Sequence, residues 1–338
     1  MGTNEVSIET ISNGEPSGQV SAALLEQYGG TRINLSELRS LQVFPRNLWE
    51  SFDNVLVETA KEELVGVADL NKRAQLTINF DAMSAGVYVR DLASEMEDAT
   101  TGLTPDSRGY AEQLNLSTIS VPLFVTYKDF LVNARYMAEA ARVGLPLRTQ
   151  QVVEATRAVS RALEYQLFRG QFTASGATAW GYTTFPERNL FTITSWLTET
   201  PANIVQQVVD MVGISVERKH FGPWILYLPY SYFAVMNKDY LVSSVYGAMT
   251  IRERILQIPR IEDIRFTYQL GAAVEEVVLV EMRSDTAQLI NGLPLSVVDW
   301  EPAGSPNWTH LFKVLTITVP LLVADYNGNC GIVHGSVS

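Results

Sequence analysis

The chain has 338 residues, 46% of them hydrophobic, and a formal net charge of −12 at pH 7. This hydrophobic content supports a sizeable core and excludes global disorder. The acidic balance argues against a surface built to grip nucleic-acid phosphates, because such surfaces usually carry a basic stripe. The single cysteine, Cys330, excludes an intrachain disulfide, so packing or association must supply the stability.

No secretory signal and no membrane span are expected. Residues 1–19 are polar and lack a basic region followed by an apolar one. The sequence has no apolar run of about 18 residues, the length that a spanning helix needs. We therefore expect no membrane partner.

An N-terminal arm is expected over residues 1–64. Residues 1–33 are rich in Gly, Ser and Asn, a composition typical of a tail, whereas residues 45–64 have apolar side chains at helical spacing. Trp49 and Phe52 lie on the apolar face of this predicted helix. Large aromatic side chains on an arm suggest a docking face, so we expect both to contact a neighbouring subunit.

The next segment, residues 65–128, is expected to form an extended loop. Apolar residues alternate with polar ones on both sides of residues 94–112, a pattern that predicts two half-buried strands. The polar, turn-rich residues 94–112 form the tip, and a loop of this length is usually functional or disordered. At this tip we expect intersubunit contacts from charged side chains: Glu95, Glu97, Asp98, Asp106 and Arg108.

Two helices are predicted after the loop. Asp129 is placed to cap a helix that runs to Arg142. Thr149 is placed to cap a second helix over residues 150–169, which Gly170 ends. At about 1.5 Å per residue the second helix is about 30 Å long, a rigid spine.

From about residue 200 the pattern becomes mixed α and β. Thr200 and Pro201 open a helix predicted through Lys219. Asn291-Gly292 predicts a hairpin turn, and Pro320 in the last long strand implies an edge or a bulge. The predicted strands are residues 224–229, 276–282, 287–290, 295–300 and 311–326.

The sequence offers no recognisable catalytic, cofactor or metal site. Its histidines, His220, His310 and His334, are scattered and lack acids or cysteines at ligand spacing. Motifs for zinc, nucleotide or nucleophilic-serine sites are missing. Adjacent acids in turns do not give the two environments that acid–base catalysis requires. We expect Cys330 to be a core residue, and no function to depend on these four side chains.

Three stretches carry a resemblance to a known family. Residues 121–170 resemble an encapsulin-type succession of strand, short helix and long helix, residues 221–241 resemble the start of an axial domain, and residues 311–333 resemble closing strands. Together with the order of the parts, they make residues 45–335 similar to the major capsid proteins of tailed bacteriophages (the Hong Kong ninety-seven fold). Encapsulins, the bacterial nanocompartment shells, share this layout.

The resemblance implies an α+β tailed-phage major capsid fold with an N-terminal arm, an extended two-stranded loop, a peripheral domain with a long spine helix, and an axial domain. The expected segments are the arm at 1–64, the loop at 65–128, the peripheral domain at 129–199, the axial domain at 200–310, and a closing strand at 311–338 that returns to the peripheral domain.

The implied function is a major capsid protein that self-assembles, as hexamers and pentamers, into an icosahedral shell around double-stranded phage DNA. DNA would be held without sequence-specific binding, and a portal, with a scaffold or decoration protein, would be further partners. The expected location is the virion capsid, assembled in the host cytoplasm. Two alternatives stay open: an encapsulin shell that holds a cargo enzyme, and a hydrolytic enzyme with an unrecognised site. A deep pocket holding His220 or Cys330 beside a perturbed carboxylate would favour the enzyme.

Overall fold

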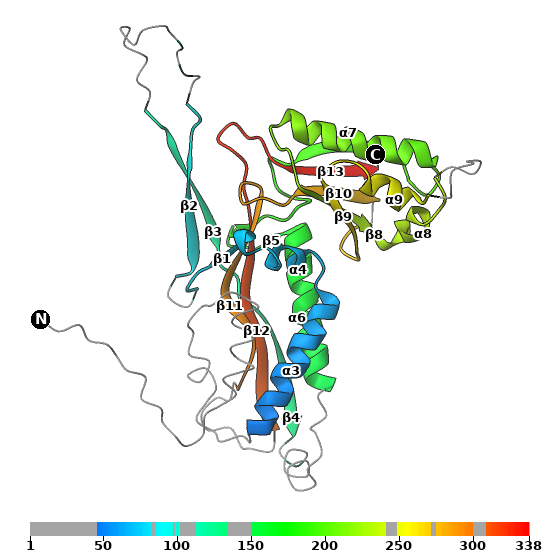
Figure 1. Cartoon of the computed structure of the whole chain (residues 1–338). Coiled ribbons are helices and arrows are strands. Elements are labelled where there is room, and N and C mark those ends of the chain that lie inside the picture. The colour runs from blue at the N-terminus through cyan, green and yellow to red at the C-terminus, as the bar shows by residue number, and fades with distance from the viewer. Residues whose placement is uncertain are drawn as a thin grey trace, which may run out of the picture.

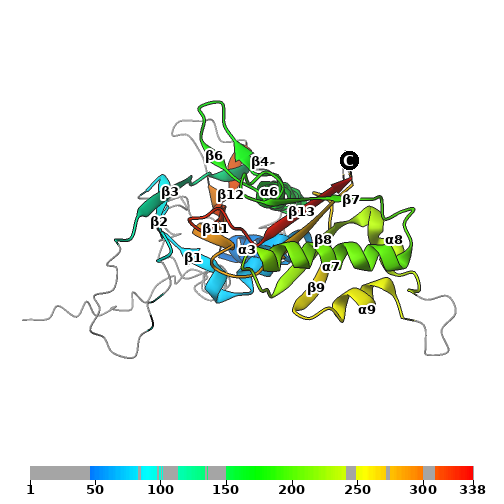
Figure 2. The ribbon, with the colours of Figure 1, turned by 90° about the horizontal axis from the view of Figure 1, so that it is seen from above.

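The structure is a computed structural model that describes residues 46–82, 85–96, 99, 101, 113–133, 135, 150–240, 249–271, 275–299 and 309–337, without the side chains of residues 46–51, 61–63 and 309. Two sheets, each with its own helices, lie one above the other in Figure 1, and a two-stranded ribbon projects from the lower one. In both views the ribbon and the helices of the upper sheet lie on opposite sides (Figure 2).

The lower sheet has four strands in the order β1-β11-β12-β4. Helices α3 and α6 pack beside it, and these two elements confirm the helices predicted at 45–64 and 150–169. The bounds are α3 Arg46–Glu63, α6 Gln150–Arg169, β1 Thr77–Asn79, β4 Thr126–Asn133, β11 Ala287–Asp299 and β12 Thr309–Leu322.

The helix predicted from Asp129 to Arg142 is wrong at its start, because residues 126–133 form the edge strand β4. Phe130 and Val132 are buried while Leu131 between them is exposed, which is the period of a strand. Pairing with β12 therefore outweighs the capping signal of Asp129. Residues 136–149 lie outside the described part.

The hairpin predicted at Asn291-Gly292 is also wrong, since both residues lie inside the continuous strand β11. The pairing with β12 shifts register between Asn291 and Leu293, as a bulge does. Gly292 is needed for close packing rather than for a turn: a Cβ there would lie 2.1 Å from the Cβ of Ala82. In a strand, glycine often marks such an approach of another backbone.

The upper sheet has five strands in the order β7-β13-β10-β8-β9. Helix α7 follows Thr200, whose side chain accepts a hydrogen bond from Asn203 N, and this confirms the predicted helix start. The bounds are β7 Asn189–Ile193, α7 Pro201–Glu217, β8 Trp224–Pro229, η2 Tyr230–Tyr232, α8 Phe233–Met236, α9 Ile251–Leu256, β9 Ile261–Thr267, β10 Glu276–Glu281 and β13 Ile332–Val337.

The two sheets divide the chain differently from the predicted boundary at residue 310. Strand β11, placed in the predicted segment 200–310, belongs to the lower sheet. Strand β13, placed in the predicted closing segment 311–338, belongs to the upper sheet, whereas β12 of that segment does lie in the lower one. The chain therefore passes between the sheets three times: after α6, after β10 and after β12.

The ribbon pairs β2 with β3 in antiparallel register, Tyr88 opposite Val121 and Leu92 opposite Ser117. This confirms the strand pair predicted on the two sides of the loop tip. The bounds of the ribbon and of the remaining short elements are β2 Val87–Ala93, β3 Leu116–Pro122, α4 Gly66–Asn71, η1 Ala74–Leu76, β5 Gln171–Phe172 and β6 Thr178–Ala179. Within the part of the chain that the structure describes, no helix combines the length and apolar character needed to cross a bilayer.

Phe52 is not a docking residue, contrary to the sequence prediction. Its ring is 1% exposed and lies edge-on to Phe130 and Phe312, with centroids 6.2 and 5.6 Å away. The apolar face of α3 packs against the lower sheet of the same subunit and is buried there. The side chain of Trp49 lies outside the described residues, so its role stays a prediction.

Replacing Phe52 by Ala should lower the free energy of unfolding of the subunit by about 3–5 kcal/mol, because it removes a large ring from a packed core. Urea unfolding of the purified subunit measures this. The exposed Asn54→Ala change on the same helix is the control and should stay within about 0.5 kcal/mol. An unchanged unfolding curve with weakened assembly would restore Phe52 as an intersubunit contact.

A buried carboxyl group joins the arm to the spine helix. Glu164 of α6 accepts hydrogen bonds from the backbone N–H groups of Val65 and Val67, at 2.6 and 3.0 Å, where α4 begins. Burial raises the pKa of Glu164 to about 7, against the lowering effect of these hydrogen bonds. The carboxyl group therefore binds its proton more tightly in the folded chain than in the unfolded one.

This raised pKa predicts that stability falls as the pH rises. The contribution of Glu164 is fully present below its unfolded pKa of 4.5 and is lost as the pH passes about 7. We expect a loss of about 3 kcal/mol over this window in the parent chain and none in Glu164→Gln. Urea unfolding at several pH values measures it, with the exposed Glu154→Gln on the same helix as the control. A Glu164→Gln profile parallel to the parent's would contradict the assignment.

Candidate functional site

The ribbon has two different faces. Tyr88, Leu92 and Ile119 point toward their own subunit and pack, with Val121, against a small core on β11 and β12. The opposite face is exposed and mixed in character. Val89 is 56% exposed and Leu116 69%, and between them Thr118 donates a hydrogen bond to Asp91. One face is thus satisfied within the subunit, while the other is available to a partner.

The tip residues predicted as contacts are only partly described. Glu95 is exposed, and its carboxylate lies 2.8 Å from the Lys219 Nζ and 3.4 Å from the Asn327 Nδ2 of its own subunit. This placement is within the chain and does not test a contact with a neighbour. The remaining predicted tip residues, Glu97, Asp98, Asp106 and Arg108, lie outside the described residues.

A cavity of about 500 Å³ lies at the base of the ribbon. Leu92 and Ile119 of the ribbon form one wall, and Trp180 and Tyr326 belong to other segments that line it. The charged side chains among its lining residues are the carboxylates of Glu187 and Asp325. The lining of the cavity is therefore mixed, apolar and polar, and includes two carboxylates.

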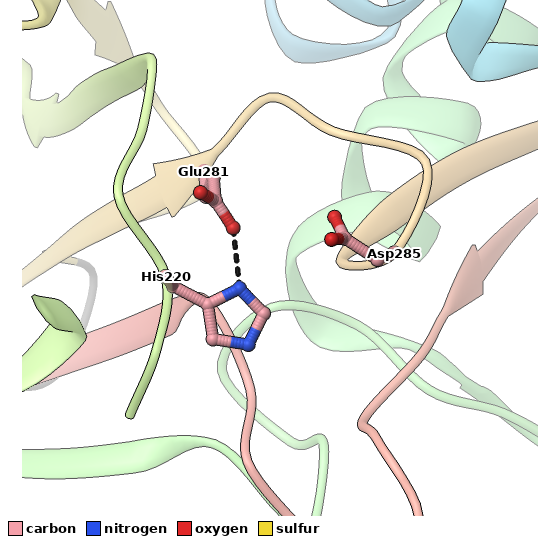
Figure 3. Close-up of side chains that lie close together, drawn as sticks. All are labelled: His220, Glu281 and Asp285. Atoms are coloured by element: carbon pink, nitrogen blue, oxygen red, sulfur yellow. Dashed lines mark hydrogen bonds and ion pairs between the residues drawn. The ribbon is translucent and has the colours of Figure 1, made fainter. Parts of the chain in front are cut away.

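A polar cluster is buried where the chain leaves the upper sheet. Figure 3 shows His220, from the segment after α7, facing Glu281 at the end of β10. His220 Nδ1 and Glu281 Oε2 form a hydrogen-bonded ion pair. Glu281 also accepts hydrogen bonds from Gly222 N at 2.7 Å and from Thr286 Oγ1 at 3.0 Å. The backbone of Asn329 hydrogen-bonds the imidazole from a third segment.

The electrostatics of the cluster favour the charged forms of both partners. Burial disfavours protonated His220, but the hydrogen bond and charge of Glu281 outweigh it and raise the pKa of the imidazole. Burial likewise opposes ionised Glu281, yet the contacts with His220, Thr286 and Gly222 lower its pKa. A Cβ on Gly331 would lie 2.6 Å from Thr286 Oγ1 and 2.8 Å from Glu281 Oε2, so the cluster closes only over glycine.

Comparison with known proteins gives a family and a fold. The family described as "Family of unknown function (DUF6260)" matches residues 38–335. The chain belongs to this family. No curated protein matches this DUF6260 chain.

Solved structures share the fold of this DUF6260 chain at low sequence identity. The virus-like particle from Pyrococcus furiosus is 12% identical with a TM-score of 0.61, and the match covers 85% of this chain and 98% of that one. The capsid of Myoviridae Phage XM1 is 10% identical with a TM-score of 0.55, covering 75% and 84%. The capsid of a native GTA particle is 11% identical with a TM-score of 0.56, covering 81% and 91%.

These matches confirm the predicted α+β tailed-phage capsid fold. The resemblance seen in the sequence is therefore confirmed at the level of fold.

Three side chains at the buried cluster of this DUF6260 chain carry metal-ligand atoms, and two of them already make other polar contacts. His220, Glu281 and Asp285 bring one ligand atom each within 4.8 Å of one another. Both oxygens of Glu281 already accept hydrogen bonds, and Asp285 pairs with Arg283 at 3.3 Å. Thr286 is fully buried, so the nearby hydroxyl is closed to a substrate. The arrangement can hold segments together by charge and hydrogen bonding.

The sequence analysis missed this cluster because its members are far apart in the chain. His220 and Glu281 are 61 positions apart. One signal was present: Glu281 ends a strand whose four middle residues are all apolar, and a carboxylate on a fully buried strand requires a partner. The prediction that His220 is isolated is therefore wrong, whereas Cys330 is buried in the core as predicted.

Replacing His220 by Gln should lower the free energy of unfolding by about 3–5 kcal/mol, because it leaves Glu281 buried without a counter-charge. The double variant His220→Gln with Glu281→Gln should lose less than the sum of the two single changes. Urea unfolding of the four proteins tests this. Additive losses would show that the two side chains do not interact.

The pH profile gives an independent check. Glu281, with a lowered pKa, contributes stability that is lost as the pH falls below 4.5, and His220, with a raised pKa, contributes stability that is lost as the pH rises above 6.5. The coupling energy of the double-variant cycle should therefore be largest between these two values. A coupling that does not change with pH would contradict the ion pair.

Proposed function

We propose that this protein is a major capsid protein, which self-assembles into an icosahedral shell around double-stranded phage DNA. The fold carries the proposal: it extends over most of the chain and over most of the capsid chains of phage XM1 and the GTA particle. At 10% and 11% identity these likenesses carry the fold alone, so the shell and its contents remain proposals to be tested.

The exposed face of the ribbon supports assembly with copies of the same chain. Val87, Val89 and Leu116 present apolar side chains to solvent on a projecting element, with the hydrogen-bonded pair Asp91 and Thr118 on the same face. Large exposed apolar side chains favour contact with a partner, and the polar pair can hydrogen-bond at such a contact. In the proposed shell this face lies over a neighbouring subunit, and the charged tip meets that subunit beyond it. Each such contact can be weak, because closed symmetry repeats it many times.

The acidic chain suits a container for DNA. A net charge of −12 gives weak repulsion from phosphates, so packaged DNA can slide without adhering. In this proposal the shell forms from hexamers and pentamers in the host cytoplasm and becomes the virion capsid. A portal, with a scaffold or a decoration protein, completes the set of partners.

A mechanical role without catalysis is part of the proposal. The enzyme alternative requires a cavity that contains a histidine or cysteine beside a carboxylate with a shifted pKa. In the described residues the cavity and the pair of His220 with Glu281 lie in different places. Neither His220 nor Cys330 is among the residues that line the described cavity. His220 is buried in a hydrogen-bonded pair, which supports a structural role for it.

A nanocompartment shell with a protein cargo is the second candidate. The likeness to the virus-like particle from Pyrococcus furiosus favours it, since that match covers 98% of the particle's chain at a TM-score of 0.61. The content of the particles separates the two candidates: nuclease-protected DNA supports the capsid, and a co-purifying enzyme supports the nanocompartment.

The purified full-length chain should form closed, regular particles in negative-stain electron micrographs. Particles isolated from phage-producing cells should contain DNA that survives nuclease treatment until the shell is opened. Particles filled with a second protein would favour the nanocompartment. A chain that stays monomeric or dimeric under every salt and pH condition would contradict both.

Leu116→Asp should prevent or weaken assembly while leaving the melting temperature of the isolated subunit nearly unchanged, because the side chain is exposed and a charge would be buried in the contact. Light scattering and thermal unfolding measure the two effects. Leu190→Asp on β7 is the matched control, since Leu190 is 68% exposed and Leu116 69%. Normal assembly of Leu116→Asp would remove the ribbon face from the proposed contact.

A further inference from the structure

The ribbon is tied to its own subunit by polar contacts with three segments. Arg90 of β2 donates hydrogen bonds to Ser284 O at 3.3 Å and to Gln288 Oε1 at 2.5 Å. Glu95 beyond β2 lies 2.8 Å from the Lys219 Nζ and accepts a hydrogen bond from Asn327. The segments are residues 218–223 after α7, residues 282–288, which connect β10 to β11 and include the first two residues of β11, and residues 323–331 after β12.

The buried cluster joins the same three segments. His220 belongs to the first, Thr286 to the second, and Asn329, whose backbone hydrogen-bonds the imidazole, to the third. Glu281, at the end of β10, binds the first two directly. Its backbone N–H donates to Gly331 O of the third segment at 3.0 Å. Among the described residues, each polar contact between the ribbon and the rest of the subunit thus ends on a segment that this cluster joins.

We propose that the His220–Glu281–Thr286 cluster is the anchor that sets the angle of the β2–β3 ribbon on the subunit. The Glu95–Lys219 ion pair is exposed, and such a pair contributes little when its ends can move, whereas the Arg90–Gln288 hydrogen bond is partly buried. The residues that these ties reach are fixed in position, because each member of the buried cluster is hydrogen-bonded. Such a network permits one arrangement of the three segments. The anchor therefore presents the exposed ribbon face in one orientation.

The anchor is a property of the folded subunit and does not depend on the proposed shell. If the shell forms, an oriented ribbon lowers the ordering cost of each contact with a neighbour. If no shell forms, the ribbon angle still depends on Glu281. The two proposals can therefore fail separately.

Spin labels can measure the ribbon angle in the full chain. One label is placed at Ser117→Cys on the ribbon and the other at Ala162→Cys on the exposed side of α6. Cys330 does not compete for the label, because it is buried and burial raises the pKa of its thiol to about 12. Pulsed electron–electron double resonance spectroscopy then gives the distribution of the distance between the two labels.

Glu281→Gln should broaden or shift this distribution relative to the parent. Glu276→Gln is the matched control: Glu276 is a buried carboxylate at the other end of the same strand and pairs with Arg169 at 2.7 Å, away from the ribbon ties. It should leave the distribution as in the parent. Equal broadening by both changes, or an unchanged distribution in folded Glu281→Gln, would overturn the proposal.

A second variant keeps the test decisive if Glu281→Gln does not fold. Arg90→Met with Glu95→Gln removes the ribbon side of the ties and leaves the cluster intact. It should broaden the same distribution while urea unfolding stays close to that of the parent. An unchanged distribution in this variant would also overturn the proposal, as would stabilisation of the parent chain by Zn²⁺ that Asp285→Asn abolishes, since the cluster would then be a metal site.

Discussion

The carboxylate of Glu281 lies where the chain passes from the upper sheet to the lower one, and its hydrogen bonds join the segments that meet there. Strand β10 ends at Glu281 in the upper sheet, and β11 begins at Ala287 in the lower one. The passage from β12 to β13 runs beside the one from β10 to β11: Val323 N donates to Thr286 O, and Glu281 N donates to Gly331 O, both at 3.0 Å. His220 adds the end of α7 to this junction, so one buried charge organises three segments.

A second buried carboxyl group, that of Glu164 on α6, also joins segments that are distant in the chain. It holds the start of α4, which connects the arm helix to the first strand of the lower sheet. The two groups respond to pH in opposite directions: burial raises the pKa of Glu164 to about 7, whereas hydrogen bonds and His220 lower that of Glu281. Acid therefore strengthens the arm junction and weakens the passage between the sheets, so the subunit carries two junctions with separate pH limits.

Much of the fold could be predicted from local patterns. The apolar stripe and caps of α6 and the Thr200-Pro201 start of α7 were sufficient, because both helices bury one face along their whole length. The predictions failed where contacts with residues distant in the sequence determine the local structure. Asp129 carries a capping signal, yet β12 pairs with that segment, and Asn291-Gly292 reads as a turn, yet Gly292 serves the approach of Ala82. Phe52 looked like a docking residue because its aromatic partners, Phe130 and Phe312, come later in the chain.

The central claim is that this fold builds a shell in which the exposed face of an anchored ribbon rests on the next subunit. A cryo-electron microscopy map of the assembled particle, at a resolution that shows side chains, tests it most directly. The account predicts a closed icosahedral lattice in which Val89 and Leu116 contact another copy of the chain, while His220 and Glu281 remain paired inside each subunit. Particles in which the ribbon face meets only solvent, or preparations without closed particles, would contradict it.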